Sequence, residues 1–338
     1  MLTPPFCEKK HSESRCSGAE ILTKVWIGAD PTESDEAVVI ILNMYEAQPT
    51  GIRSTAVEHL REVAAGDRFE FGENWSRFLT VIDDDRIRQA ELSLSKMLGF
   101  PLAGKSFIDV GSGSGLFSLV ARRLGARVCS FDYDTKSVAC TQELKRRYFA
   151  DDSSWTVEQG SALDPNYLAS LGKFDVVYSW GVLHHTGAMW QALENVVGLV
   201  AEGGTLFIAI YNDQGKFSRR WMRLKKFYNG APKPLKLLCV LGSCAVLWWR
   251  PMVKDLVRLR PFESWRRAGG ARGMSAWWDA VDWVGGYPFE VAKPEEIFDF
   301  YHKRGFVLER LRTEGGSLGC NEFVFTKSDR ENSRRSSG

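Results

Sequence analysis

Between residues 106 and 211 the sequence alternates between short β-rich runs and helical segments. The strand candidates are Phe107–Val110, Arg127–Phe131, Trp155–Gln159, Phe174–Ser179 and Thr205–Tyr211. Helical patterning lies between them, for example over Leu116–Leu124 and Ser137–Phe149. Such alternation is typical of a parallel sheet whose strands are joined by right-handed helical crossovers. The sequence therefore predicts a doubly wound α/β domain.

The flanking segments complete the predicted organisation. The expected parts are a flexible leader over 1–35, an N-terminal helical region over 36–100 with helical patterning at 36–66 and 75–99, an α/β core over 101–211, an insertion over 212–292, the end of the core over 293–327 and a disordered tail over 328–338. The last part of the core reads as one helix, Pro294–Arg304, and two strands, Phe306–Thr313 and Asn321–Thr326. We thus expect a mostly parallel seven-stranded sheet with N-terminal helices and a cap before the last two strands.

A glycine-rich loop follows the first strand candidate, in the run Ile108-Asp-Val-Gly-Ser-Gly-Ser-Gly115. Glycines let the backbone turn sharply and approach a ligand closely. A dinucleotide fingerprint requires glycine or alanine where this chain has Leu116. Asp109 would also repel a pyrophosphate but attract a cationic or zwitterionic ligand. The loop is interpreted as a site for such a ligand, with a plain strand-to-helix turn as the alternative.

A second acid, Asp132, ends the next strand seventeen residues after Gly115. At this spacing a carboxylate reaches the ribose hydroxyls of a nucleoside that lies across the strand ends. The alternative is that Asp132 caps the following helix, a role that Asp134 or Thr135 would fill equally well. Together, the two acids favour a nucleoside ligand that carries positive charge.

The successive segments IDVGSGSG, FDYD, EQGSALD and FDVVYSWGVLHHTG resemble the motifs of class I S-adenosylmethionine-dependent methyltransferases. The branch most similar contains the ubiquinone and menaquinone biosynthesis methylases. The resemblance is strong over residues 100–215 and weaker over the strands at 306–326. It implies a Rossmann-like methyltransferase fold and S-adenosylmethionine as cofactor, and it says little about the methyl acceptor.

The resemblance also implies which residues bind the cofactor. The residues that would bind the methionine part are Asp109, Gly111, Ser112, Gly113 and Gly115. Asp132 would bind the ribose, with Tyr133 beside it, and Ser161 and Ala162 would contact the adenine. The sulfonium would lie beside Ser179 and Trp180. The family often has Asp at the adenine position that Ser161 occupies here, and a hydroxyl can still accept from the adenine amino group. No metal is implied, and none of the seven cysteines has C-x-x-C spacing.

Two histidines, His184 and His185, follow the fourth strand, where cofactor and acceptor should meet. A sulfonium methyl is already activated, so catalysis mainly aligns the donor and the acceptor. An imidazole near neutral pKa can in addition take the proton of a hydroxyl or thiol acceptor. Either histidine is therefore a candidate general base, and packing of the loop is the alternative role for both.

Missing motifs argue against methylation of nucleobases. Enzymes that methylate exocyclic amines usually have Asn or Asp, two prolines and an aromatic residue after the fourth strand, where this chain has SWGVLHH. Methylation at C5 of pyrimidines requires a Cys that follows Pro, and no Cys here does. A nucleic-acid substrate is therefore not expected.

The insertion carries an excess of both positive charge and tryptophan. Over 212–290 there are fifteen Lys and Arg against six Asp and Glu, so that this segment has a net charge of +9 and the remainder −7. It also contains seven of the twelve tryptophans. Arg219, Arg223 and Lys226 share one helical face, and Trp221, Leu224 and Tyr228 share another. The alternatives are a soluble cap with an aromatic core, a cap that contacts an anionic membrane, and a grip for RNA.

The sequence thus predicts methyl transfer to oxygen or sulfur of a small, lipophilic or aromatic acceptor. An RNA-modifying methyltransferase and a non-catalytic cofactor-binding protein remain the alternatives. An odd number of cysteines and a polar N-terminus favour the cytoplasm, with contact to the inner face of a membrane as a variant. The longest apolar run, Leu237–Trp249, has thirteen residues and is expected to be too short to span a bilayer.

Overall fold

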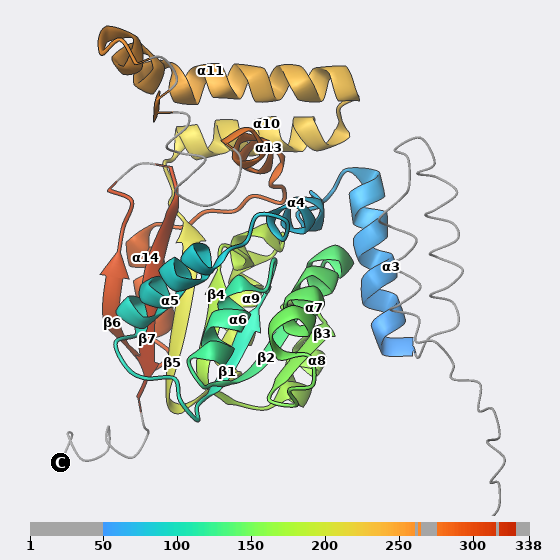
Figure 1. The fold of residues 1–338 in the computed structure, drawn as a ribbon, viewed down its shortest axis with the longest axis vertical. Coiled ribbons are helices and arrows are strands. Elements are labelled where there is room, and N and C mark those ends of the chain that lie inside the picture. The colour runs from blue at the N-terminus through green and yellow to red at the C-terminus, as the bar shows by residue number, and fades with distance from the viewer. Residues whose placement is uncertain (1–49, 261–262, 265–275, 316–317, 329–338) are drawn as a thin grey trace, which may run out of the picture. The chain divides into compact units, whose positions relative to one another are not determined.

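The computed structural model describes residues 50–260, 263–264, 276–315 and 318–328, and its centre is a seven-stranded sheet (Figure 1). The strands are β1 Ser106–Val110, β2 Arg127–Asp132, β3 Trp155–Gln159, β4 Phe174–Trp180, β5 Val200–Tyr211, β6 Phe306–Arg312 and β7 Cys320–Lys327. Their order is β3-β2-β1-β4-β5-β7-β6. Neighbours are parallel except at β7, which runs antiparallel to both β5 and β6. The predicted mostly parallel α/β fold is confirmed.

Strand order reverses between β1 and β4, because the chain runs outward from β1 to β3 and then returns to the other side of β1. In open α/β sheets, ligands bind outside the carboxyl ends of the strands at such a switch point. The segments that follow β1, β2 and β4 are therefore brought to one edge, although they are far apart in the sequence.

Helices cover both faces of the sheet, in agreement with the near-continuous apolar runs of its central strands. One face packs against α5 Asp84–Leu98, α6 Leu116–Arg123 and α7 Thr135–Phe149, and the other against α8 Pro165–Leu171, α9 Met189–Val197 and α14 Pro294–His302. Adjacent residues of one strand serve opposite layers: Phe107 is buried under the first group and Ile108 under the second. This packing fixes the position of the strand ends.

Within the described residues, α5 is preceded by α3 Thr50–Ala65 and α4 Gly72–Phe78. The helical segment expected at 75–99 is divided, because the chain leaves the helix at Leu79 and α5 begins after Asp83, whose side chain accepts the N–H of Arg86 at 2.9 Å. The expected leader, and all of the expected tail beyond residue 328, lie outside the described residues.

The described part of the insertion forms a cap at the carboxyl end of the parallel strands (Figure 1). Its helices there are α10 Lys216–Gly230, α11 Lys233–Val257 and α13 Ala276–Gly285. Its core is aromatic and aliphatic, with Trp221, Tyr228 and Phe289 buried. The two predicted faces of α10 are confirmed, since Trp221 and Tyr228 point into this core while the cations at 219, 223 and 226 are exposed.

Helix α11 is longer than the apolar run within it. It has 25 residues, and an 18-residue window has a mean hydropathy of 1.3 with 11% of it buried. By length and composition α11 can therefore cross a membrane, so the expectation that this segment is too short was wrong. The error arose because the helix continues past the uninterrupted apolar run at both ends.

Candidate active site

The glycine loop after β1 forms a backbone cradle. Gly111, Gly113 and Gly115 have φ values of 80°, 55° and 80°, which a residue with a side chain rarely adopts. A Cβ on Gly111 would lie 2.3 Å from a methyl carbon of Val182, so the next loop of the site approaches this backbone directly. The N–H groups of Gly111 and Ser112 donate to the carbonyl of Phe131 at 2.9 and 3.0 Å and join the loop to the end of β2.

Asp109 lies under this loop and is only 2% exposed. Its carboxylate accepts a hydrogen bond from Ser118 Oγ at 2.5 Å, and no basic side chain forms an ion pair with it within the described chain. Burial raises the pKa of Asp109 to about 7. A ligand that brings an ammonium group would restore the charge of this carboxylate, which fits the predicted methionine end of the cofactor.

The carboxylate of Asp132 accepts two backbone hydrogen bonds, from the N–H of Gly113 at 2.8 Å and from that of Asp134 at 2.9 Å. Burial raises its pKa to about 7. The capping alternative is wrong for Asp132, because the N-cap of α7 is Asp134, which accepts the N–H of Lys136 at 2.8 Å. Each oxygen of Asp132 keeps a lone pair that can accept a ribose hydroxyl. The ribose role stays a prediction that this geometry permits.

The other predicted cofactor residues lie at the same edge. Ser161 follows β3, and its Oγ accepts the N–H of Leu163 at 3.1 Å, while Ala162 lies next to it and is buried. Ser179 is buried, and its hydroxyl donates to the carbonyl of Val110 at 2.9 Å, which joins β4 to β1. Ser179 thus acts on the site through the backbone of β1.

Trp180, the last residue of β4, is 38% exposed. Its Nε1 donates to Glu322 Oε1 at 3.0 Å, so the indole leans toward β7. The structure therefore brings the predicted residues of β1, β2, β3 and β4 together along the carboxyl edge of the sheet, as their order in the sequence implied.

The two candidate bases lie on a single 3-10 turn, Leu183–His185, and both are buried. His184 Nδ1 accepts the backbone N–H of Tyr211 at 3.3 Å, so its proton is on Nε2. His185 Nδ1 lies 2.6 Å from the carbonyl of Pro288, so this nitrogen is the donor and Nε2 carries the lone pair. Burial lowers both pKa values, that of His185 to about 3. His185 thus has a basic nitrogen that no backbone donor occupies.

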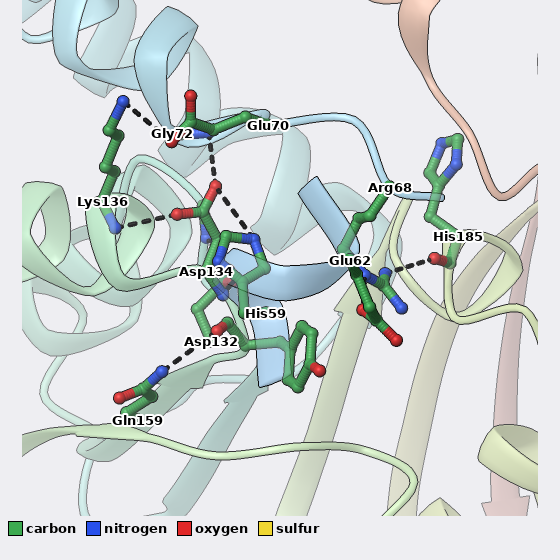
Figure 2. Close-up of polar contacts among 12 residues, drawn as sticks. His59, Glu62, Arg68, Glu70, Gly72, Asp132, Asp134, Lys136, Gln159 and His185 are labelled. Carbon is green, nitrogen blue, oxygen red and sulfur yellow. Dashed lines mark hydrogen bonds and ion pairs between the residues drawn. The ribbon is translucent and has the colours of Figure 1, made fainter. Parts of the chain in front are cut away.

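A segment without a role in the sequence-based prediction, Arg68–Trp75, touches both sides of the site (Figure 2). The Arg68 guanidinium donates to the carbonyls of His185 at 2.8 Å and Thr186 at 3.3 Å, and it pairs with Glu62 at 2.5 Å. It also lies 4.8 Å from the centre of the Tyr133 ring. Arg68 therefore joins the turn of the candidate bases to the predicted ribose side.

The segment Arg68–Trp75 also contacts the start of α7 and the glycine loop. Asp134 accepts the N–H of Gly72 at 2.7 Å, and Lys136 pairs with Glu70 at 2.8 Å (Figure 2). A Cβ on Gly113 would lie 3.1 Å from Trp75 Nε1, so this indole packs on the loop. The concentration of aromatic and charged residues in a turn was the signal in the sequence, and only folding reveals its contacts.

Known proteins that are similar to this chain include methyltransferases. Residues 82–273 match the family described as methyltransferase domain, and the chain belongs to this family. The ubiquinone biosynthesis O-methyltransferase of Brucella ovis is 26% identical over 234 residues, which cover 65% of this chain and 83% of that protein. A tRNA U34 carboxymethyltransferase of Methylococcus capsulatus is 32% identical over 120 residues, or 35% of this chain and 36% of that protein.

Among solved structures, a magnesium protoporphyrin IX methyltransferase of Synechocystis PCC 6803 with bound SAH is similar to 76% of this chain and 94% of its own length, with a TM-score of 0.44 and 16% identity. The family and the site together define an S-adenosylmethionine-dependent methyltransferase. When bound, this cofactor supplies a methyl group already activated on a sulfonium. The glycine cradle and the buried carboxylate of Asp109 fit its methionine end, and Asp132 fits its ribose.

Proposed function

We propose that this enzyme transfers a methyl group to oxygen, or sulfur, of a small lipophilic or aromatic acceptor. The observation that carries the proposal is the position of Tyr211 at the end of β5. Its ring centre lies 4.0 Å from that of His184, and 5.6 and 5.2 Å from those of Trp283 and Phe289. The aromatic core of the cap is therefore continuous with the turn of the candidate bases, where an acceptor would be held.

His185 is the residue we assign to proton removal. Its Nδ1–H donates to Pro288, which fixes the ring and leaves the lone pair on Nε2 for an acceptor hydroxyl or thiol. The low pKa that burial imposes makes His185 a weak base, so we expect its contribution to lie in orientation together with proton transfer. The name of the Brucella relative, an O-methyltransferase, supports oxygen as the acceptor atom.

The test is to incubate the purified chain with methyl-labelled cofactor and a cell extract, and to separate lipid, small-molecule and RNA fractions. Label in the organic-soluble or small-molecule fraction supports the proposal. Label in RNA would instead support the RNA-modifying alternative, and absence of label from every fraction would support a non-catalytic protein. The Gly111→Val variant, whose cradle is blocked, is the control for transfer by other enzymes of the extract.

We also propose that the cap lies on an anionic membrane and so brings the enzyme to its acceptor. The exposed face of α11 carries large apolar side chains: Leu237, Leu238, Leu241, Val246, Trp249 and Val253. Exposed cations accompany it on α11, at Arg250 and Lys254, and on α10. An apolar face flanked by basic residues is the pattern of helices that lie in the interface of an anionic bilayer.

The orientation of α11 favours a helix that lies along the membrane. Its opposite face is packed on the cap, with Val240 and Ser243 buried. Near its end, Asp255 accepts the N–H and the hydroxyl of Ser264 at 2.6 and 2.7 Å. Because Val240 and Ser243 hold one face of α11 against the cap, we propose peripheral attachment at the cytoplasmic face.

Co-sedimentation with anionic and neutral vesicles at low and high salt tests the attachment. We expect binding to anionic vesicles that weakens as salt screens the charges. Replacement of Arg219, Arg223 and Lys226 by Glu should abolish it. A matched control replaces Arg61, Lys173 and Lys303, which are exposed outside the cap, by Glu. Recovery of the wild type in the supernatant under all conditions would reduce the insertion to a soluble cap.

A further inference from the structure

The base of the cap contains a buried cation that the proposed methyl transfer does not use. Lys225 of α10 is fully buried, and its Nζ donates to the carbonyl of Trp283. The ammonium lies 4.6 Å from the ring centre of Trp283 and 4.8 Å from that of Phe289. One carbonyl occupies one of its three N–H groups, so Lys225 has further hydrogen bonds to give.

Three more nitrogens in the same region are buried and have no hydrogen-bond partner in the described structure: Nε1 of Trp221, Nε1 of Trp283 and Nε2 of His184. An indole nitrogen can only donate. Nε2 of His184 also donates, because Nδ1 of this ring already accepts an N–H, and the backbone carbonyl of Ala209 acts on this ring as an acceptor. The two indoles, like the ammonium of Lys225, therefore require a further partner that accepts.

The side chains that carry these donors form a continuous series of ring contacts, which ends at the turn of the candidate bases. The ring centres of Trp221 and Trp283 are 5.5 Å apart, Trp283 and Tyr211 are 5.6 Å apart, and Tyr211 lies 4.0 Å from His184. The cluster thus connects α10 and α13 of the cap with the carboxyl end of β5, next to the candidate active site.

Such a cluster is costly for a protein that binds nothing there. A buried donor without a partner loses its hydrogen bonds to water and gains none in return, and a buried ammonium loses its hydration as well. The carboxylate whose charge acts on Lys225 is Asp282 of α13, and this group accepts a hydrogen bond from Asn74 of α4. A ligand with acceptor oxygens would satisfy the donors that remain.

We propose that Lys225, Trp221 and Trp283 form a subsite for an oxyanion, a carboxylate or phenolate, carried on the aromatic ring of the methyl acceptor. This inference rests on the proposed function and narrows its acceptor class. The rings of Tyr211 and Phe289 supply flat apolar walls, and the nitrogens supply donors only. Because burial lowers the pKa of Lys225 to about 7, an arriving oxyanion draws a proton onto this amine and strengthens the pair.

The experiment compares two probes of equal shape, 1-naphthoate and the uncharged 1-naphthamide, by calorimetry on the full chain saturated with SAH. We expect the wild type to bind naphthoate about tenfold more tightly or better, the effect of one hydrogen bond to a charged group. Lys225→Met should bring the ratio of affinities close to one. Lys303→Met, which removes an exposed cation outside the cap, should keep it.

A second variant keeps the test informative if Lys225→Met does not fold. Trp221→Phe keeps the ring and removes one donor, and it should lower the affinity for naphthoate a few-fold. The SAH affinity of each variant reports whether the cofactor domain is folded. An unchanged ratio in Lys225→Met, equal binding of both probes by the wild type, or no binding of either at millimolar concentration would overturn the subsite.

The outcome is separable from that of the proposed function. Labelling of RNA together with Lys225-dependent selectivity for naphthoate would refute the small-molecule acceptor and leave the anion site standing. Labelling of a small or lipid acceptor that has neither a carboxylate nor an ionisable phenol would refute the subsite and leave the proposed function standing.

Discussion

Arg68 Nη1 donates to the backbone carbonyl of His185 at 2.8 Å, across 117 positions of the sequence. The same guanidinium reaches the next carbonyl, at Thr186, and lies over the ring of Tyr133. One side chain from the N-terminal helical region thus holds the turn of the candidate base and contacts the predicted cofactor side. Arg68 is a positioning residue in this arrangement, because it acts through the backbone of its neighbours.

Arg68→Lys should lower methyl transfer about tenfold or more, because an ammonium cannot hold both carbonyls as the planar guanidinium does. The SAH affinity should change much less, so that kcat rather than cofactor binding carries the effect. Kinetics with an acceptor identified by labelling would measure this. Arg77→Lys, on an exposed arginine paired with Glu73, is the control. Equal kcat in Arg68→Lys and wild type would show that the contact is dispensable.

Asp132→Ala should weaken binding of S-adenosylmethionine by ~1–3 kcal/mol, the range for hydrogen bonds to a charged group. Asp132→Asn should cost less, since an amide oxygen still accepts from the N–H of Gly113. Calorimetry measures both, with Asp151→Ala as an exposed control. Wild-type affinity in Asp132→Ala would confine this residue to holding the loop.

Gly111→Ala should impair both stability and cofactor binding. The new methyl would lie 2.3 Å from Val182, and φ is 80° at this position. Left-handed backbone costs ~1–2 kcal/mol for a residue with Cβ, and overpacking adds ~1–3 kcal/mol. The double variant Gly111→Ala with Val182→Ala should recover the overpacking part only. Thermal unfolding with and without SAH separates the two terms, and full recovery in the double variant would contradict the backbone strain.

His185→Gln should lose ~10²–10⁴-fold in turnover while it keeps cofactor affinity. Because burial lowers the pKa of His185 to about 3, its imidazole is uncharged at every pH well above this value. The rate of the wild type should therefore show no acidic limb near the ordinary histidine pKa of about 6.5. A pH profile of kcat/KM checks this. A limb at that pH that disappears in His185→Gln would show that the ring is solvated during turnover.

Lys225 should make stability depend on pH. Its pKa is about 7 in the folded chain and 10.5 in the reference state, so between these values the unfolded state binds a proton that the folded state lacks. Stability from this residue therefore rises as pH increases through this window and is lost as pH falls toward 7. Lys225→Met should lack the rise, and exposed Lys226→Met should keep it. Denaturant unfolding at neutral and alkaline pH measures the difference, and parallel curves for wild type and Lys225→Met would contradict it.

Local patterns of the sequence were enough to predict the sheet and the edge of it at which the cofactor is expected to bind. The period of the apolar residues distinguishes strands from helices, and the ends of parallel strands must meet at one edge. The sequence alone therefore places the glycine loop, Asp109 and Asp132 at one edge of the sheet. The break after Leu79 and the full length of α11 could not, since capping by Asp83 and helix continuation past an apolar run leave weak signals.

Only the tertiary structure decided which side chains act on each other across the site. Asp134, not Asp132, caps α7; Arg68 reaches His185; and Lys225 is buried under Trp283. Each of these relations joins helices or turns whose separation is set by packing of the whole domain. The sequence by itself determined the fold and the region of the site, because both follow from residue type and period. Partners, burial and pKa follow from three-dimensional neighbours, which no local period specifies.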